Sequence, residues 1–120
     1  MQIATHLSEE LARYLDLASS EAKLTAANMA NIDTPGYRAV GFAFEKEMSS
    51  ALSALDNGKP ATAPRVGEVD GLVARPDGNN VSLDREGLNL AEAQLRYRTG
   101  VALLHQEVQR VMDAIHADSK

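Results

Sequence analysis

The stretch Leu90–Ile115, "LAEAQLRYRTGVALLHQEVQRVMDAI", carries the strongest fold signal in the chain. Its apolar residues recur at alternating intervals of three and four, a spacing that repeats every seven residues. They form the seam Leu90, Tyr97, Val101, Leu104, Val108, Val111 and Ile115. Gln94 is a single polar interruption of this series. A heptad pattern of this length is typical of a helix that packs along another helix, so we predict a helix over residues 88–117.

The N-terminal segment, residues 1–32, also has a helical period. Its apolar stripe consists of Ile3, Leu7, Leu11, Ala18, Ala22, Thr25 and Met29. Ser8, followed by two acidic residues, is a plausible start for this helix, because acids favour a helix N-terminus. Pro35 requires the helix to end near residue 32, since the residue before a proline is disfavoured in the α conformation. Each predicted helix therefore has one apolar face that needs a partner.

The middle of the chain, residues 33–87, has a different character. Gly and Pro are concentrated there, in sequences such as "NGKPATAPRVGEVDGLVARPDGNN". A short apolar pattern beginning near Phe42 predicts a brief helix that ends at Asn57-Gly58, and the segment Val66–Val73 could form a β-hairpin. We therefore predict an all-α fold with a single elongated domain, 1–120. Its two long terminal helices pack as an antiparallel, coiled-coil-like hairpin, and the Gly/Pro-rich central insert could hold a short helix or β-hairpin.

Composition excludes several classes of function. The net charge of −5, without a basic block, argues against nucleic-acid binding, which depends on neutralising phosphates. The absence of Cys excludes disulfides, thiolate metal sites and a cysteine nucleophile. The N-terminal sequence lacks the pattern of a cleaved signal peptide, and no stretch approaches the ~20 apolar residues of a membrane span. We expect a cytoplasmic protein unless another export route applies.

No constellation of residues indicates catalysis. His6, His105 and His116 are far apart and have no metal-ligand spacing, so we interpret them as surface histidines. "DGNN", Asp77–Asn80, resembles part of a calcium loop but lacks the closing glutamate, and we predict a turn. The sequence therefore predicts a protein that is not an enzyme and that has no catalytic residues, metal, cofactor or small-molecule substrate.

The segment Ala26–Ala39, "AANMANIDTPGYRA", ends the first helix in an unusual way. Asn28 and Asn31 lie three residues apart on one helix face, each beside an alanine that permits close approach. One interpretation is an ordinary helix end. The other is a hydrogen-bonded junction at which the chain leaves a packed bundle. The junction residues would be Asn28, Ala30, Asn31, Thr34, Pro35, Gly36 and Tyr37.

This segment resembles the signature of the rod and hook family, the axial proteins of the bacterial flagellum, in which A-N-x-A-N-x-x-T-P-G-Y follows the first helix. The later run "DGNNVSLDREGLNLAEAQLRYRTGVALL" and the aromatic pair in "VGFAFEKEM" are similar to those of a proximal rod protein. The resemblance covers nearly the whole chain. One departure is Gly87, where the family usually has Met or another helix former, and it leaves the start of the C-terminal helix open by a few residues.

The resemblance implies a structural subunit of the proximal rod, at the base of the shaft that transmits motor torque. Implied partners are copies of itself, other proximal rod proteins, a FliE-type adaptor and the membrane ring at the rod base. It also implies export through the flagellar type III apparatus into a periplasmic rod, without a cleaved signal peptide. Phe44 and Met48 fit an export motif, although an ordinary i,i+4 apolar pair explains them equally well.

Two alternatives remain open at this stage. A soluble adaptor or chaperone could offer a helical hairpin as a groove to a partner helix. The chain could also be another proximal rod protein of the same family.

Overall fold

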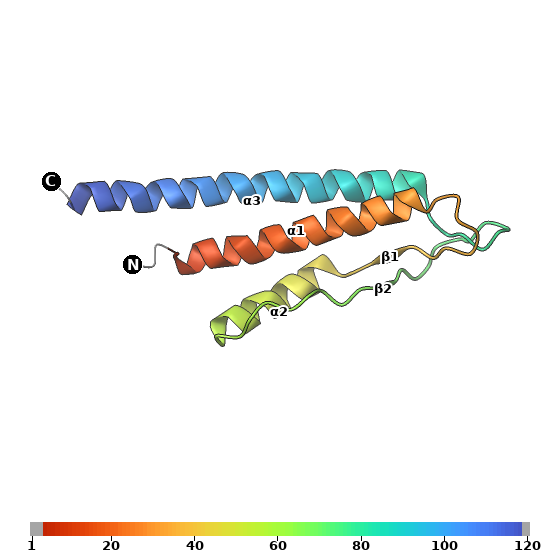
Figure 1. The fold of residues 1–120 in the computed structure, drawn as a ribbon, viewed down its shortest axis with the longest axis horizontal. Helices are drawn as coiled ribbons and strands as arrows, with labels where there is room; N and C mark the ends of the chain where they lie inside the picture. Colours follow the sequence, from red (N-terminus) through yellow and green to blue (C-terminus); the bar gives the residue numbers. More distant parts are fainter. Residues whose placement is uncertain (1–3, 119–120) are drawn as a thin grey trace.

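The computed structural model describes residues 4–118, which form three helices and a two-stranded ribbon (Figure 1). The elements are α1 (His6–Ala30), β1 (Val40–Gly41), α2 (Phe44–Asp56), β2 (Gly67–Glu68) and α3 (Leu83–Asp118). The expectation of a mostly helical chain with a long C-terminal helix is confirmed. The ribbon is antiparallel and pairs Val40 with Glu68 and Gly41 with Gly67. Ile3, which the N-terminal stripe included, lies outside the described residues.

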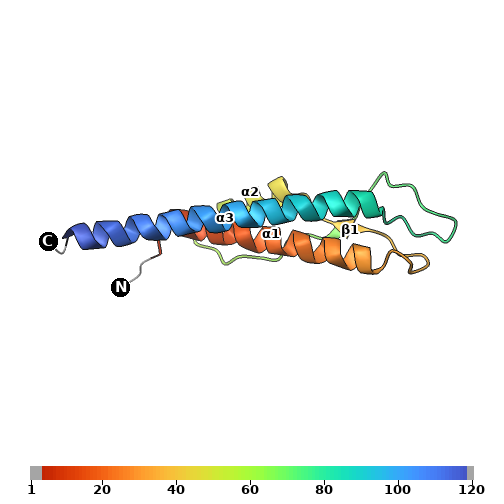
Figure 2. The same cartoon turned by 90° about the horizontal axis from the view of Figure 1, so that it is seen from above.

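The molecule is elongated. Its extents are 70 × 27 × 18 Å, and its radius of gyration is 18.4 Å. A compact domain of this length would have a radius of about 14 Å. Helices α1 and α3 lie side by side along the long axis, and α2 and the ribbon lie against α1 (Figures 1 and 2). Such a shape exposes much of each helix surface.

Local sequence explains where α1 begins. Thr5 is the N-cap: its hydroxyl accepts a hydrogen bond from the Ser8 amide at 3.1 Å, and the Thr5 amide donates to the Ser8 hydroxyl at 2.8 Å. This reciprocal pair satisfies two donors that the first helical turn leaves free. The helix therefore begins at His6 rather than at Ser8. Ser8 is the third residue of the helix and forms the second half of the capping box.

Helix α3 begins at Leu83, five residues before the predicted position 88. The Arg85 amide donates to the Ser82 hydroxyl at 3.3 Å and the Glu86 amide donates to the Ser82 carbonyl at 2.9 Å, so Ser82 caps the helix. Gly87 falls within the first turns and has no neighbouring atom where a Cβ would stand. Its only penalty is conformational entropy, which is about 1 kcal/mol and does not stop a capped helix.

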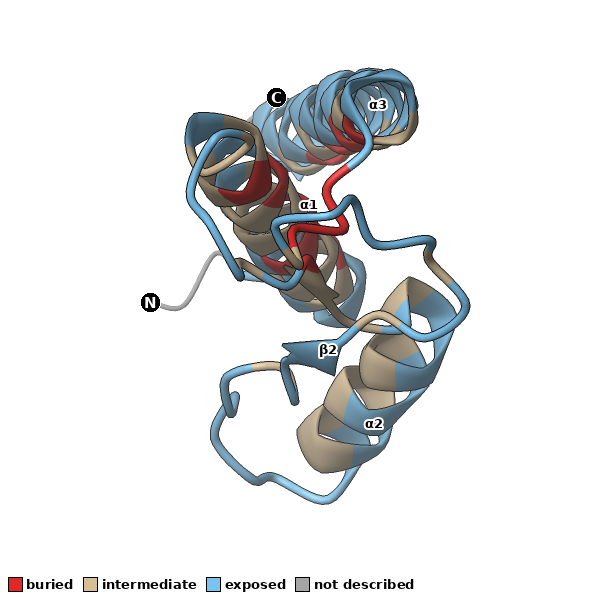
Figure 3. Ribbon diagram, turned by 90° about the vertical axis from the view of Figure 1, so that its right-hand side faces the viewer, coloured by how far each residue is buried: buried red, intermediate tan, exposed pale blue. Residues whose placement is uncertain are grey.

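Buried residues lie where α1 faces α3 and where the chain turns at the end of the helix pair (Figure 3). The apolar core is small and consists of Leu11, Leu17, Ala18, Ala39, Val81 and Ala93. The most fully buried large side chains include the polar residues Asn28, Asn79 and Glu86. Polar contacts therefore hold a substantial part of this fold together.

Candidate functional site: a polar junction and an open apolar stripe

Asn28 uses its side-chain amide as a strand partner for the chain leaving α1. It is 1% exposed; its Nδ2 donates to the Val40 carbonyl at 2.9 Å, and its Oδ1 accepts the Val40 amide at 3.1 Å. The Tyr37 hydroxyl also donates to Oδ1, at 3.2 Å. A side-chain amide carries a donor and an acceptor on adjacent atoms, which match the C=O and N–H of one backbone residue. Asn28 therefore fixes the start of the ribbon against α1.

Asn31 closes the C-terminus of α1. As the C-cap it donates from Nδ2 to the Ala27 carbonyl at 2.8 Å and accepts the Thr34 hydroxyl at 3.1 Å. Gly36 has a φ of +76°, in the region that favours glycine, and it completes the turn after Pro35. The amide of Gly36 donates to the Asp77 carbonyl at 2.9 Å, which joins this turn to a second one.

Asn79 belongs to that second turn and caps α1 from a distance of about fifty residues along the chain. It is fully buried, and its Nδ2 donates to the carbonyls of Asn31, Ile32 and Thr34 at 2.8, 3.0 and 2.8 Å. Its Oδ1 accepts the Val81 amide at 2.8 Å. The Asn31 carbonyl belongs to the C-cap of α1 and the other two to the turn that follows it, so this side chain holds the turn against the end of the helix.

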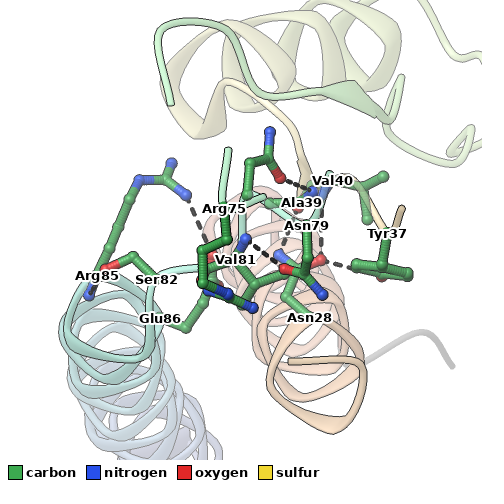
Figure 4. Close-up of polar contacts among 11 residues, drawn as sticks. Asn28, Tyr37, Ala39, Val40, Arg75, Asn79, Val81, Ser82, Arg85 and Glu86 are labelled. Carbon is green, nitrogen blue, oxygen red and sulfur yellow. Dashed lines mark hydrogen bonds and ion pairs between the residues drawn. The ribbon is translucent and has the colours of Figure 1, made fainter. Parts of the chain in front are cut away.

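Two further residues complete the network: Arg75, which Figure 4 shows beside Asn79 and Val81, and Asn80. Arg75 donates to the carbonyls of Val81, at 2.6 Å, and Ile32. Asn80 accepts the Ala39 amide on Oδ1 at 2.6 Å. We call the six residues Asn28, Asn31, Tyr37, Arg75, Asn79 and Asn80 the polar junction. It ties the end of α1, the start of the ribbon and the approach to α3 into one unit.

The polar junction joins two motifs that the sequence presents separately. Of the signature residues, Asn28, Asn31, Thr34 and Tyr37 make side-chain bonds, whereas Ala30 and Pro35 are exposed. "DGNN" is a turn, with the Asn79 amide donating to the Asp77 carboxylate at 3.0 Å. Sequence reasoning did not identify Asn79, Asn80 or Arg75 as partners of the signature. The signal that the sequence offers is the adjacent pair Asn79 and Asn80, whose side-chain amides can bind backbone groups at the end of the first helix.

The contact between α3 and α1 is centred on four positions spaced by seven. These are the buried α3 residues Glu86, Ala93, Gly100 and Glu107. Gly100 permits the closest approach, because a Cβ there would stand 2.7 Å from Leu15 Cδ2 and 3.0 Å from Tyr14 Cδ1. The heptad period of the sequence is therefore present in the structure, with small and charged residues on its innermost line.

The predicted seam lies to one side of that line. Four of its members, Tyr97, Val101, Val108 and Ile115, are 40–52% exposed, and we call them the open stripe. The remaining members, Leu90, Leu104 and Val111, are half-buried. Within this chain α1 does not cover the open stripe. The predicted hairpin, in contrast, packs the whole seam against the N-terminal helix. The reason is phase: positions seven apart share a face, and the innermost face starts at residue 86 instead of 90.

The N-terminal stripe is divided in the same way. Leu11 and Ala18 are buried, Met29 is half-buried and Leu7 is 46% exposed. Near Leu7, the two helices meet through polar groups. Glu107 accepts hydrogen bonds from the Thr5 hydroxyl at 2.8 Å and from Arg110 at 2.7 Å. Hydrogen bonds from Arg110, and next from Thr5, lower the pKa of Glu107 below its ordinary value.

An ion pair crosses between the two helices nearer the ribbon. Arg96 donates to both carboxylate oxygens of Glu21, at 2.8 and 2.6 Å, and its guanidinium lies 4.1 Å from the centre of the Phe44 ring. Burial raises the pKa of Glu21, although Arg96 opposes this shift. Phe44 also meets Tyr14 edge to face, with ring centres 5.5 Å apart. Phe44 and Met48, the residues that fit an export motif, thus lie on α2, with Phe44 held in a packed cluster.

The acidic and histidine side chains of the described residues are dispersed. In residues 4–118 no group of three or more His, Asp or Glu side chains could hold a metal ion. His6 lies 2.8 Å from Glu10 and 3.3 Å from Asp56 on the surface. Within the same range, no helix is long and apolar enough to cross a membrane. The arrangement can position helices and present an apolar surface.

Comparison with known proteins gives consistent similarities. The chain is 31% identical to the flagellar basal body rod protein FlgB of Salmonella typhimurium, over 84% of this chain and 86% of that protein. It is 31% identical to FlgB of Cereibacter sphaeroides, over 89% and 91% of the two chains. For FlgB of Escherichia coli the identity is 27%, over 86% and 88%. No protein-family model matches the chain.

Proposed function

The chain belongs to the family of FlgB flagellar basal body rod proteins, and from this premise we propose that it builds the proximal part of the rod by helix packing between subunits. It is a structural subunit of the flagellar basal body rod, not an enzyme. The observation that carries the packing proposal is the open stripe of α3. Apolar side chains that a single chain leaves exposed over several helical turns gain stability when a second molecule covers them.

The length difference between the long helices supports this proposal. The Thr5 hydroxyl at the start of α1 meets Glu107, and α3 continues from there to Asp118 (Figure 1). Val108, Met112 and Ile115 lie on this extension and are 52, 41 and 40% exposed. We propose that α1 and α3 act as a coiled-coil-like hairpin whose extension packs between neighbouring subunits. Contacts between different surfaces of successive copies do not close and therefore build a tube.

In this proposal the polar junction sets the direction in which the central insert leaves the helix pair. Its bonds link α1 to residues 75–81 through buried amides, and buried amides leave few alternative geometries because an unmade bond is costly. The signature residues Ala30, Thr34, Pro35 and Gly36 then serve to end the helix and form the turn. A fixed departure angle would let every subunit present the insert, residues 33–87, identically around the rod.

The remaining parts of the proposal concern partners and delivery. We propose copies of the chain, other proximal rod proteins, a FliE-type adaptor and the membrane ring at the rod base as its neighbours. We also propose that it reaches the periplasmic rod through the flagellar type III apparatus. Phe44 and Met48 would be read there in the unfolded chain, since Phe44 is half-buried against Arg96 in the folded one.

The double substitution Leu104→Asp with Val108→Asp tests the packing proposal. It places two carboxylates in the apolar surface, so we expect loss of swimming and of rod assembly while export remains measurable. The matched control is Gln106→Asp with Gln109→Asp, which adds the same charge at exposed polar positions of the same helix. Normal swimming of the Leu104→Asp, Val108→Asp strain would contradict the proposal. Loss of swimming in both strains would also contradict it, because charge alone would then be responsible.

A further inference from the structure

A hollow of 430 Å³ lies between α1, α3 and the ribbon, on the flank of the helix pair away from the open stripe. Four carboxylates and two guanidiniums line it, an excess of two negative charges. Its apolar wall includes Leu24 and Phe42. The hollow plays no part in the polar junction or in the contact that Gly100 makes with Leu15.

Both arginines of the hollow are already engaged within the chain. Arg96 pairs with Glu21, and Arg85 lies 3.1 Å from Oε1 of Glu86. Glu68 and Glu92 have no ion pair among the described residues, and Glu92 adds to the raised pKa of Glu21. The negative charge of the hollow is therefore not neutralised by any cation that the structure places there.

Glu86 is the most informative of these carboxylates. Its residue is fully buried, it lines the hollow, and its Oε2 has no hydrogen-bond partner among the described residues. A buried carboxylate oxygen without a donor is costly, and the first turns of α3 compensate only part of that cost. The hollow is thus lined by a residue whose buried carboxylate has one oxygen without a donor, beside an apolar wall suited to the stem of a long side chain.

The chain also has a basic side chain suited to this hollow, on the opposite flank. A second depression, lined by Ser19, Ala22, Tyr97 and Arg98, lies across the helix pair from the hollow. Arg98 is exposed and has no ion pair or hydrogen bond among the described residues. It follows Tyr97 of the open stripe, so a copy that covers the stripe meets Arg98 as well.

We propose that Arg98 of one copy inserts into the hollow of the next copy and pairs with the carboxylates of Glu86 and Glu92. A guanidinium has five donors in a planar fork, which fits several carboxylates better than a compact cation does. No group of three or more carboxylates in residues 4–118 is arranged to hold a metal ion, which favours a side chain over a divalent cation. The contact joins different surfaces of identical chains, so it repeats along the assembly. This inference rests on the proposed function.

Because the chain has no Cys, a cross-linking experiment has no background. The variant Glu92→Cys with Arg98→Cys is expressed in place of the natural chain, and isolated basal bodies are treated with a short bismaleimide. We expect a ladder of dimers and larger multimers, since each copy carries both halves of the contact. Each single variant should give no ladder. Positions 92 and 98 are six residues apart on one helix and point to different faces, and a link within one copy would join no second chain, so only contacts between copies produce the ladder.

The outcomes separate this inference from the proposed function. Basal bodies that contain the double variant without a ladder overturn the inference and leave the rod assignment intact. Absence of the unsubstituted chain from basal bodies would overturn the assignment itself. If the cysteine variant is not incorporated into basal bodies, an exchange of the two charges tests the contact instead. Arg98→Glu should stop swimming and Glu92→Arg should restore it in the same chain, and failure of that rescue rejects the contact.

Discussion

Replacing Asn79 by aspartate removes both N–H donors from the centre of the polar junction while keeping the size of the side chain. In the native chain these hydrogens serve three carbonyls, those of Asn31, Ile32 and Thr34. Each carbonyl keeps a second donor, from the amides of Thr34 and Tyr37 and from Arg75, so each lost N–H removes one ordinary hydrogen bond, worth about 0.5–1.5 kcal/mol. A carboxylate at the negative end of α1 adds about 0.3–1 kcal/mol. We expect Asn79→Asp to lower the free energy of unfolding by about 1–4 kcal/mol, out of a typical total of about 5–15 kcal/mol.

The assay is urea unfolding of the purified chain, followed by circular dichroism. The matched control is Asn57→Asp, because Asn57 also caps a helix but is exposed and donates only to the Ser53 carbonyl, at 2.9 Å. An exposed bond of that kind is worth about 0.5–1.5 kcal/mol at most. The midpoint should therefore fall further for Asn79→Asp, which loses two buried donors, than for Asn57→Asp, which loses one exposed donor. Equal shifts for the two variants would refute the argument that Asn79 holds the junction.

Acidification gives the same variant a second test. Burial and the facing carbonyls raise the pKa of the introduced carboxyl above its value in the unfolded chain. The folded state then binds the proton more strongly, so the stability deficit relative to the native chain should shrink as the pH falls. A protonated carboxyl also recovers one donor. If the difference in free energy of unfolding between variant and native chain stayed constant from neutral to acidic pH, the loss of stability would come from altered packing and not from the missing N–H donors.

Two further predictions concern the contact between α1 and α3. Gly100→Ala should destabilise the chain by about 1 kcal/mol, because overpacking against Leu15 outweighs the gain in helix propensity, whereas Gly87→Ala should stabilise it by about 0.5–1 kcal/mol. Stabilisation by both substitutions, measured by thermal unfolding, would contradict the close approach. Because the folded pKa of Glu107 is lowered, its stabilisation is present above the ordinary value of 4.5 and is lost as the pH falls through the folded pKa. Glu107→Gln should flatten this acid-side loss in a pH series of unfolding, and an unchanged slope would reject the contribution of the Arg110 pair.

The sequence was sufficient to predict the helices because their signals are local and repeated. The seven-residue period of Leu90, Tyr97 and Leu104 required a long helix, and Pro35 set the end of the first one. The phase of the contact could not be obtained in the same way. The seven-residue period that can be recognised in the sequence is formed by large apolar residues. The closest contact with α1 is instead made at the small residues Ala93 and Gly100, which a search for apolar periodicity does not select. Steric fit against Leu15 decides that phase, and it is a property of two helices together.

The candidate site was only half predictable for a related reason. Asn28 and Asn31 were recognisable because amides are unusual in the last turns of a helix. The long-range partners were not recognisable: Val40 lies 12 residues from Asn28, and Asn79 lies 48 residues from Asn31 and resembles any turn residue until it is placed under the end of α1. Long-range pairing of this kind leaves no periodic trace. The predicted range 88–117 begins inside α3; Ser82, which the sequence also offers as a cap, starts the helix at Leu83, ahead of Gly87.

The most direct test of the account is the accessibility of the open stripe before and after assembly. Val108→Cys introduces the only thiol of the chain, at a position that is 52% exposed in the single subunit. A soluble maleimide should label this thiol rapidly in the purified subunit, with the urea-unfolded chain giving the limit of full reaction. The account predicts that the thiol is protected in isolated basal bodies. Equal labelling of free subunit and basal body would contradict the claim that neighbouring rod subunits cover α3.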